Sequence, residues 1–289
     1  VSVSVIEQET GAVRAIVGGR GDKTGNLTLN RATDTVRQPG STFKVVAAYA
    51  PAIDSADMTL ATVFNDAPFY YDEGKPVKNW YDTGYKGLSS IRYAIEQSMN
   101  IVSVKTLTQI SPQLGFDYLL NFGFTTLVDR RVESNGTVVS DIGQPLALGG
   151  ITDGVTNLEL NAAYAAIANH GTYIKPKLYT KIVDHNGNVL IDNTQPESKQ
   201  VIKETTAWLL TSAMQDVFLF SDTIEENIKM GRRKVMDMEE IRTAAGHAQA
   251  SSFIEKMDEQ YDTVIGERGV GLSGGQKQRI SIARALSKK

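Results

Sequence analysis

The chain has 289 residues, enough for one large domain or two of ordinary size, and 41% of them are hydrophobic, which is sufficient for a real core. The formal net charge of −3, without a long block of one sign, argues against nucleic acid or an anionic membrane surface as a partner. There is no cysteine, which excludes disulfides and thiolate chemistry, and no run of about 18 apolar residues that could span a membrane.

The N-terminal segment predicts a β-hairpin followed by a helix. Apolar residues alternate on either side of a turn at Gly11, so residues 1–6 and 12–17 are expected to be paired strands. A turn at Gly40 then precedes an apolar helix that Ser41 opens.

The middle of the chain predicts a loop and then mostly helix. The loop, at about residues 66–87, is rich in glycine and aromatic residues; it could line a groove for a carbohydrate or peptide, or simply pack its rings against the core. The later elements expected in chain order are helices at about 89–97, 101–109 and 114–122, a helix between an N-cap at Thr156 and a stop at Gly171, a hairpin that turns at Asn186 and Gly187, and a helix from about 203.

One pair of residues carries a possible chemistry. Ser41 is the only serine followed three residues later by a lysine, Lys44, and on a helix this spacing places both side chains on one face. A serine hydroxyl is a weak nucleophile until a base removes its proton, and a lysine desolvated among apolar neighbours could have its pKa lowered enough to do so. The helix N-terminus would favour a developing oxyanion. For such a pair alone, the alternative is a serine N-cap beside a solvated lysine.

Three passages together resemble the transpeptidase domain of penicillin-binding proteins. They are "RQPGSTFKV" at 37–45, "AIEQSMNIVSVK" at 94–105 and "LALGGITDGVTNLELNAAYAAIANHG" at 146–171, and the resemblance extends over about residues 1–217 in the family's order and spacing. It implies an α+β fold of the penicillin-binding-protein and β-lactamase type. It also implies an acyl-transfer enzyme that crosslinks peptidoglycan and is acylated by β-lactams.

The resemblance gives roles to four residues. Ser41 would be the nucleophile that attacks the penultimate D-alanine carbonyl, with its own backbone N–H as half of the oxyanion hole, and Lys44 would accept its proton. Ser98 would pass a proton towards the leaving group, and Asn100 would hold the substrate amide; the alternative for these two is a polar helix end. No cofactor is implied for this part, and the partners implied are peptidoglycan stem peptides and β-lactams.

The same resemblance requires a third triad of the Lys-Thr-Gly type, which would bind the substrate carboxylate from a strand C-terminal to the other motifs. The string occurs at residues 23–25, before the nucleophile, and we interpret it as unrelated. The transpeptidase fold and its site are therefore expected to be incomplete. Without the C-terminal strands, the first hairpin should keep an unpaired edge and the domain should expose apolar surface.

The C-terminal quarter resembles a different family, the nucleotide-binding domain of ABC transporters. "LSGGQ" at 272–276 continues as "KQRISIARAL". The resemblance implies that this segment contacts the γ-phosphate of ATP bound on an opposite subunit and that a Q-loop glutamine contacts metal and water; the residues concerned are Ser273, Gly274, Gly275, Gln276 and Gln215. The alternatives are a glycine-rich helix start without function and a Gln215 that belongs to the preceding helix.

ATP and Mg²⁺ are implied only by this second resemblance. No Walker A loop precedes the segment and no Walker B strand follows it in the sequence, so we expect a mostly helical ABC-type subdomain fragment that cannot bind ATP alone. No metal site is expected elsewhere, because the three histidines are scattered without ligand spacing.

Two domains follow from these motifs: residues 1–214, transpeptidase-like but lacking its C-terminal strands, and residues 215–289, an ABC helical and signature fragment. The tripeptide at 215–217 fits the sequence patterns of both families, so the boundary is placed only to within these three residues. Because the sequence starts without Met and stops inside a helical pattern, we expect both ends to be cut.

Penicillin-binding transpeptidases act outside the cytoplasmic membrane and ABC nucleotide-binding domains inside it. Three hypotheses remain: a transpeptidase, a piece of an ABC ATPase, or a non-functional chimera of natural, engineered or erroneous origin.

Overall fold

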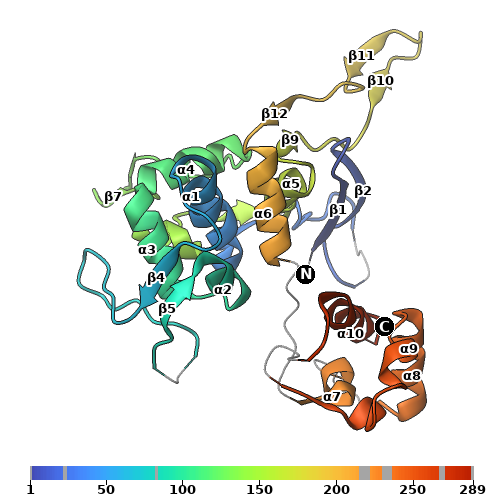
Figure 1. Ribbon diagram of the computed structural model, residues 1–289. Helices are drawn as coiled ribbons and strands as arrows, with labels where there is room; N and C mark the ends of the chain where they lie inside the picture. The colour runs from blue at the N-terminus through green and yellow to red at the C-terminus, as the bar shows by residue number, and fades with distance from the viewer. Residues whose placement is uncertain are drawn as a thin grey trace. The chain divides into compact units, whose positions relative to one another are not determined.

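The computed structural model describes residues 2–21, 25–81, 84–214, 222–229, 236–266 and 271–287. The chain divides into two compact units, Val1–Ala213 and Met214–Lys289 (Figure 1). Each unit has a hydrophobic core of its own. The seam expected at residues 215–217 lies outside the described residues.

Unit 1, residues 1–213, mixes helices with short antiparallel strand pairs. Its strands are β1 Val3–Glu7, β2 Ala12–Val17, β3 Val36–Arg37, β4 Val63–Asp66, β5 Gly87–Ser90, β6 Arg131–Val132, β7 Val138–Val139, β8 Val155–Thr156, β9 Thr172–Ile174, β10 Lys181–Val183, β11 Val189–Asp192 and β12 Ser198–Gln200. Its helices and helical turns are η1 Gly40–Thr42, η2 Lys44–Tyr49, α1 Ala50–Ser55, α2 Ile91–Glu96, α3 Asn100–Ile110, α4 Pro112–Asn121, η3 Gln144–Leu148, α5 Asn157–Ala168 and α6 Glu204–Met214.

The N-terminal hairpin forms as predicted. β1 and β2 pair antiparallel about a turn in which Gly11 has φ +68°. β1 lies on α5, where Ser4 Oγ donates a hydrogen bond to Asn157 Oδ1 at 2.8 Å. In the part of the chain that the structure describes, no third strand joins this sheet, and the side chains of Val3 and Val5 are half exposed. Lys177 bridges to Ala12 at the start of β2, and apart from this bridge the edges that the sequence led us to expect are present.

The core of unit 1 surrounds η2, every residue of which is buried. The helix predicted to start at Ser41 is not a regular α-helix: residues 40–42 form a 3-10 turn, η2 is a π-helical turn, and α-helix begins only at Ala50. Pro51 contributes to the break between η2 and α1, because it has no N–H for the Ala47 carbonyl and so removes one α-helical hydrogen bond there. That carbonyl lies against Gly115 of α4, where a Cβ would be only 2.5 Å away.

The helices around η2 follow the prediction closely, with one difference. α3 and α4 lie at 100–110 and 112–121, close to the expected ranges. The helix expected at 89–97 is shorter, because residues 87–90 pair with β4 as β5 and leave α2 to start after Ser90, whose side chain caps it. Residues 89 and 90 of the expected helix therefore belong to β5, which pairs with β4, the strand that ends at Asp66.

α5 begins and ends as its terminal residues indicate. Thr156 and Glu159 form a capping box in which the threonine hydroxyl accepts from the Glu159 N–H at 3.1 Å and the carboxylate accepts from the Thr156 N–H at 3.0 Å. The helix ends at Ala168, and Gly171 follows with φ +84°.

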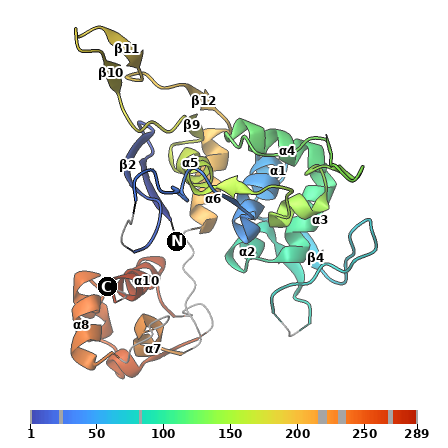
Figure 2. The same cartoon turned by 180° about the vertical axis from the view of Figure 1, so that it is seen from behind.

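The hairpin of β10 and β11 also forms, with Gly187 at φ +84° in its turn. All residues of both strands are exposed, and the hairpin projects from the helices of unit 1 (Figures 1 and 2).

Unit 2, residues 214–289, is mostly helical in its described part. Its elements are β13 Asp222–Thr223, α7 Ile224–Lys229, α8 Met238–His247, α9 Ser251–Ile254, η4 Gln260–Asp262, β14 Val264–Ile265 and α10 Gly274–Leu286. Ile224, Ile241 and Ile280 bring α7, α8 and α10 into one small core. Across both units, none of the described helices is long and apolar enough to cross a membrane.

The α5 capping box yields a stability prediction. Replacing Thr156 by alanine removes the hydroxyl that accepts the Glu159 N–H, and we expect a loss of about 1 kcal/mol in the free energy of unfolding of unit 1. Thr156→Ser keeps the hydroxyl and should stay near wild type. Urea unfolding followed by circular dichroism measures both variants, and an equal loss in the serine variant would contradict the capping role.

Candidate active site

The side chain of Lys44 lies inside the core, with 2% of the residue exposed. Its Nζ donates to the Ser98 carbonyl at 2.6 Å, to Ser98 Oγ at 3.0 Å and to Asn100 Oδ1 at 2.5 Å. An ammonium group has three N–H donors, and these three oxygens accept all of them. The solvated lysine considered as an alternative is therefore wrong, and three of the four residues expected in the site lie together.

Burial changes the ionisation of this lysine. Loss of hydration disfavours the charged form and lowers the pKa of Lys44 from its usual 10.5 to about 8. A substantial part of the amine is then unprotonated just above neutral pH, which is what a proton acceptor requires.

Ser41 precedes Lys44 by three residues and lies in the exposed turn η1. The turn is held on two sides: Tyr164 of α5 donates its hydroxyl to the Thr42 carbonyl at 2.6 Å, and Gly149 packs on Gly40, where a Cβ at 149 would lie 2.5 Å from the Gly40 nitrogen. Among the described residues there is no hydrogen bond from Ser41 Oγ to Lys44. The contact that the spacing led us to expect thus stays a prediction.

Ser98 has an uncommon backbone conformation for a serine. It lies between α2 and α3 with φ +49°, in the left-handed region that disfavours side chains with a Cβ. This conformation turns both its carbonyl and its hydroxyl towards Lys44. The sequence offers no signal for it, because a lone serine between two helices has many unstrained conformations.

Asn100 is the first residue of α3 and joins the lysine to a distant loop. Its Oδ1 accepts from Lys44 Nζ, and its Nδ2 donates to the Lys78 carbonyl at 2.7 Å. The next loop residue, Asn79, accepts from the Asn100 backbone N–H at 2.8 Å. The aromatic loop therefore supports the site. The sequence offered a groove as one alternative for this loop, but it gave no indication that Asn79 contacts α3.

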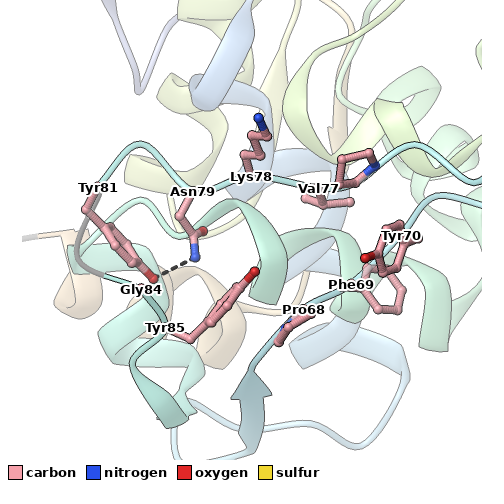
Figure 3. Close-up of a pocket in the computed structure, with 10 residues that line it drawn as sticks. Pro68, Phe69, Tyr70, Val77, Lys78, Asn79, Tyr81, Gly84 and Tyr85 are labelled. Carbon is pink, nitrogen blue, oxygen red and sulfur yellow. Dashed lines mark hydrogen bonds between the residues drawn. The ribbon is translucent and has the colours of Figure 1, made fainter.

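The same loop encloses a hollow with a volume of about 280 Å³. Figure 3 shows Phe69 and Tyr70 on one side of it and Tyr81 and Tyr85 on the other. Its lining is completed by Pro68, Pro76, Val77, Lys78, Asn79 and Gly84. The aromatic rings thus line a hollow, and two of them, Phe69 and Tyr81, also pack against the hydrophobic core.

The second group of candidate residues lies at the start of α10. Ser273 and Gln276 bond to each other: the Ser273 N–H donates to Gln276 Oε1 at 2.8 Å, and the Gln276 N–H donates to Ser273 Oγ at 3.3 Å. This is the pattern of an N-terminal capping box. Gly274 and Gly275 form the first turn between them. Gln215 lies outside the described residues, as do Lys23 and Thr24 of the early Lys-Thr-Gly string.

Comparison with known proteins points to one family for most of the chain. The family model described as "Penicillin binding protein transpeptidase domain" matches residues 1–223. Penicillin-binding protein 1A of Clostridium tetani is 36% identical over 215 residues, which are 72% of this chain and 27% of that protein. Penicillin-binding protein 1F of Bacillus subtilis is 36% identical over 216 residues, 75% of this chain and 28% of that protein. The chain thus spans about a quarter of these relatives.

A solved structure agrees with this. The PonA1 protein of Mycobacterium tuberculosis, in complex with penicillin V, superposes with a TM-score of 0.61 at 27% sequence identity. The match covers 74% of this chain and 54% of that one. The α+β fold of unit 1 is thereby confirmed as that of a penicillin-binding transpeptidase domain.

A second family model, described as "ABC transporter", matches residues 176–289. It overlaps the first match between residues 176 and 223, whereas the compact units divide at residues 213 and 214.

The lowered pKa of Lys44 predicts how stability depends on pH. The folded state binds fewer protons than the unfolded state between pH 8 and pH 10.5, so the free energy of unfolding should rise through this interval relative to Lys44→Met. The difference between the two proteins should change by on the order of 3 kcal/mol. Urea unfolding at pH 7.5, 9 and 10.5 measures it, and parallel curves for the two proteins would contradict a depressed pKa.

Proposed function

Since the chain belongs to the penicillin-binding protein transpeptidase family, we propose that residues 1–214 form a serine acyltransferase domain with Ser41 as its nucleophile. The observation that carries the proposal is the buried Lys44 amino group, hydrogen-bonded to Ser98 and Asn100 one helical turn after that serine. Desolvation of an amine opposes folding, and for this reason strongly desolvated amines occur often at functional sites.

In the proposed reaction each of these groups has one role. Lys44, after losing one proton to solvent, takes the proton of Ser41 Oγ as the oxygen attacks the substrate carbonyl, and the backbone N–H of Ser41 donates to the oxyanion. The carbonyl–nitrogen bond then breaks, and the leaving nitrogen receives a proton from Lys44 through the hydroxyl of Ser98. The product is an ester of Ser41. An acceptor amine attacks that ester, releases Ser41 and forms the crosslink.

The substrates of this chemistry are amides with a carboxylate nearby. In the family these are peptidoglycan stem peptides and β-lactams, and the complex of PonA1 with penicillin V supports the latter for this chain. Asn100 would donate its second Nδ2 hydrogen to the substrate amide. The reaction uses no cofactor and takes place outside the cytoplasmic membrane, where peptidoglycan lies.

We further infer that the site is weakened in this polypeptide. No triad of the Lys-Thr-Gly type follows Asn100 anywhere in the sequence. The substrate carboxylate then lacks its charge-assisted partner, an interaction worth about 1.5–3 kcal/mol, or roughly 10- to 100-fold in rate.

Residues 215–289 form, in this proposal, a helical and signature fragment of an ABC nucleotide-binding domain. The family match at 176–289 and the "LSGGQ" string at 272–276 support this origin. The polar groups of Ser273 and Gln276 cap α10, and the sequence supplies no Walker A loop to hold phosphates. Because the two families act on opposite sides of a membrane, the chain as a whole is a chimera in which only the transpeptidase part retains a partial site.

Labelling with a fluorescent penicillin tests the first claim. We expect a covalent adduct on the full chain that disappears in Ser41→Ala, with an acylation rate constant about 10- to 100-fold below that of the matching domain of Clostridium tetani penicillin-binding protein 1A. Because Lys44 must be unprotonated, the rate should rise with pH through about 8.

Two results would overturn this. Absence of a Ser41-dependent adduct at millimolar penicillin would rule out the acyltransfer function, and a rate equal to that of the relative would rule out the weakening. Thr42→Ser, next to the nucleophile and exposed, keeps the hydroxyl that bonds to the Pro39 carbonyl and serves as the matched control.

For the C-terminal part we expect no saturable ATP binding by the purified chain, with or without Mg²⁺, because the sequence contains no Walker A motif to hold phosphates. Isothermal titration calorimetry measures it. Binding that is lost in Ser273→Ala would show that the signature segment works as a site after all. Amplification of the source DNA across the codons for residues 212–219 would separately show whether the junction exists.

A further inference from the structure

Asn79, in the aromatic loop, makes four hydrogen bonds that tie two parts of unit 1 together. Its Oδ1 accepts from the backbone N–H groups of Asn100 at 2.8 Å and Ile101 at 3.2 Å. Its Nδ2 donates to Asp66 Oδ1 at 2.8 Å and to the Tyr81 hydroxyl at 2.7 Å, the second of which is drawn in Figure 3. The two lone pairs of Oδ1 and the two hydrogens of Nδ2 are thus all used.

The chemistry of these partners requires an amide at this position. A backbone N–H can only donate, so the atom that faces α3 must be an acceptor. A carboxylate can only accept, so the atom that faces Asp66 must be a donor. Aspartate at position 79 would meet the first requirement but would place a second carboxylate against Asp66.

Asp66 is a rigid anchor for this amide. It is fully buried at the end of β4, which pairs with β5 at Gly87, and its other oxygen accepts from the Tyr81 hydroxyl at 2.5 Å and the Lys86 N–H at 2.8 Å. The position of Asn79 is therefore set by a sheet, although Asn79 itself lies in a loop.

At its other end, Asn79 takes the place of a local helix cap. The N-cap residue of α3, Met99, has no side chain that could accept the first N–H groups, and Asn79 accepts two of them from outside the helix. The neighbouring Lys78 carbonyl accepts from Asn100 Nδ2 at 2.7 Å. Backbone and side chain of Asn100 are thus both held by the loop, and its Oδ1 then accepts from Lys44.

We propose that Asn79 is a positioning residue for the acyltransfer site: held by Asp66 and Tyr81, it fixes the first turn of α3 and so places Asn100 against Lys44. The catalytic meaning of this inference rests on the function proposed above. The effect of Asn79 on the position of the Lys44 amino group can be measured without any substrate.

The first measurement uses the full chain labelled with ¹³Cε-lysine. The Lys44 signal is identified by its loss in Lys44→Met. In Asn79→Asp, repulsion between the two carboxylates displaces the start of α3, and we expect the Lys44 signal to shift or broaden. Asp66→Asn combined with Asn79→Asp restores a carboxylate–amide pair in swapped order and keeps both bonds to α3. The Lys44 signal of the double variant should return towards its wild-type position.

A matched control separates positioning from general loss of stability. Asn161 of α5 also uses its amide to tie two segments, donating to the Ser4 carbonyl at 2.9 Å and to Ser4 Oγ at 3.0 Å, but has no contact with the site residues. Asn161→Asp should lower the melting temperature as Asn79→Asp does and leave the Lys44 signal unchanged.

The second measurement is acylation by a fluorescent penicillin at increasing concentration. Asn79→Asp should lower the limiting acylation rate by at least about 10-fold, since a small misplacement of a catalytic group has effects of this size, and leave the concentration at half-saturation nearly unchanged. The double variant should recover most of the rate.

The outcomes are distinct. An unchanged Lys44 signal in folded Asn79→Asp, an equal change in Asn161→Asp, or a double variant no closer to wild type than the single one would overturn the inference. If Asn79→Asp does not fold, the comparison of the double variant with wild type decides. Failure of the wild-type chain to react at Ser41 would remove the proposed function, and the spectra would still decide the coupling.

Discussion

The site in unit 1 depends on the burial of one amino group. Removing an ammonium from water costs several kcal/mol unless its donors are satisfied, and the three acceptors of Lys44 all come from residues 98 and 100. This requirement explains the other irregular features nearby. Ser98 adopts a left-handed conformation that presents two oxygens to the amine, and α3 starts at the residue that supplies the third. The strain at Ser98 persists because the buried amine would otherwise lack partners.

Much of this arrangement could be predicted from local patterns. Alternation identified the first hairpin and capping residues identified α5, whereas the resemblance of two short motifs to a known family led us to expect Lys44, Ser98 and Asn100 in one site; these three are in contact in the structure. The prediction was wrong about the helix after Ser41, where a 3-10 turn and a π-helical turn precede α1 and Pro51 leaves the Ala47 carbonyl without its α-helical donor. It missed Asn79 because the two N–H groups that donate to its Oδ1 lie 21 and 22 residues away, and hydrogen bonds at such separation leave no periodicity in a sequence.

In the C-terminal part, a recognisable motif occurs without the rest of its site. "LSGGQ" is a specific string, yet in this chain Ser273 and Gln276 cap their own helix, so the same residues that resemble a nucleotide contact also satisfy a local structural need. A motif supports a function only with the groups that complete its site. The four motif residues of unit 1 have a supporting loop, sheet and core around them, whereas the supports of a nucleotide site do not occur among the described residues of unit 2.

The hairpin of β1 and β2 affects how the protein behaves in solution. Among the described residues no further strand pairs with β1, and half-exposed Val3 and Val5 lie on that strand, so its outer edge can accept a strand from another chain. A second copy of the chain carries the same hairpin and is one source of such a strand. We therefore expect any self-association through backbone pairing to grow with concentration and to be reduced by an excess of a short β-forming peptide.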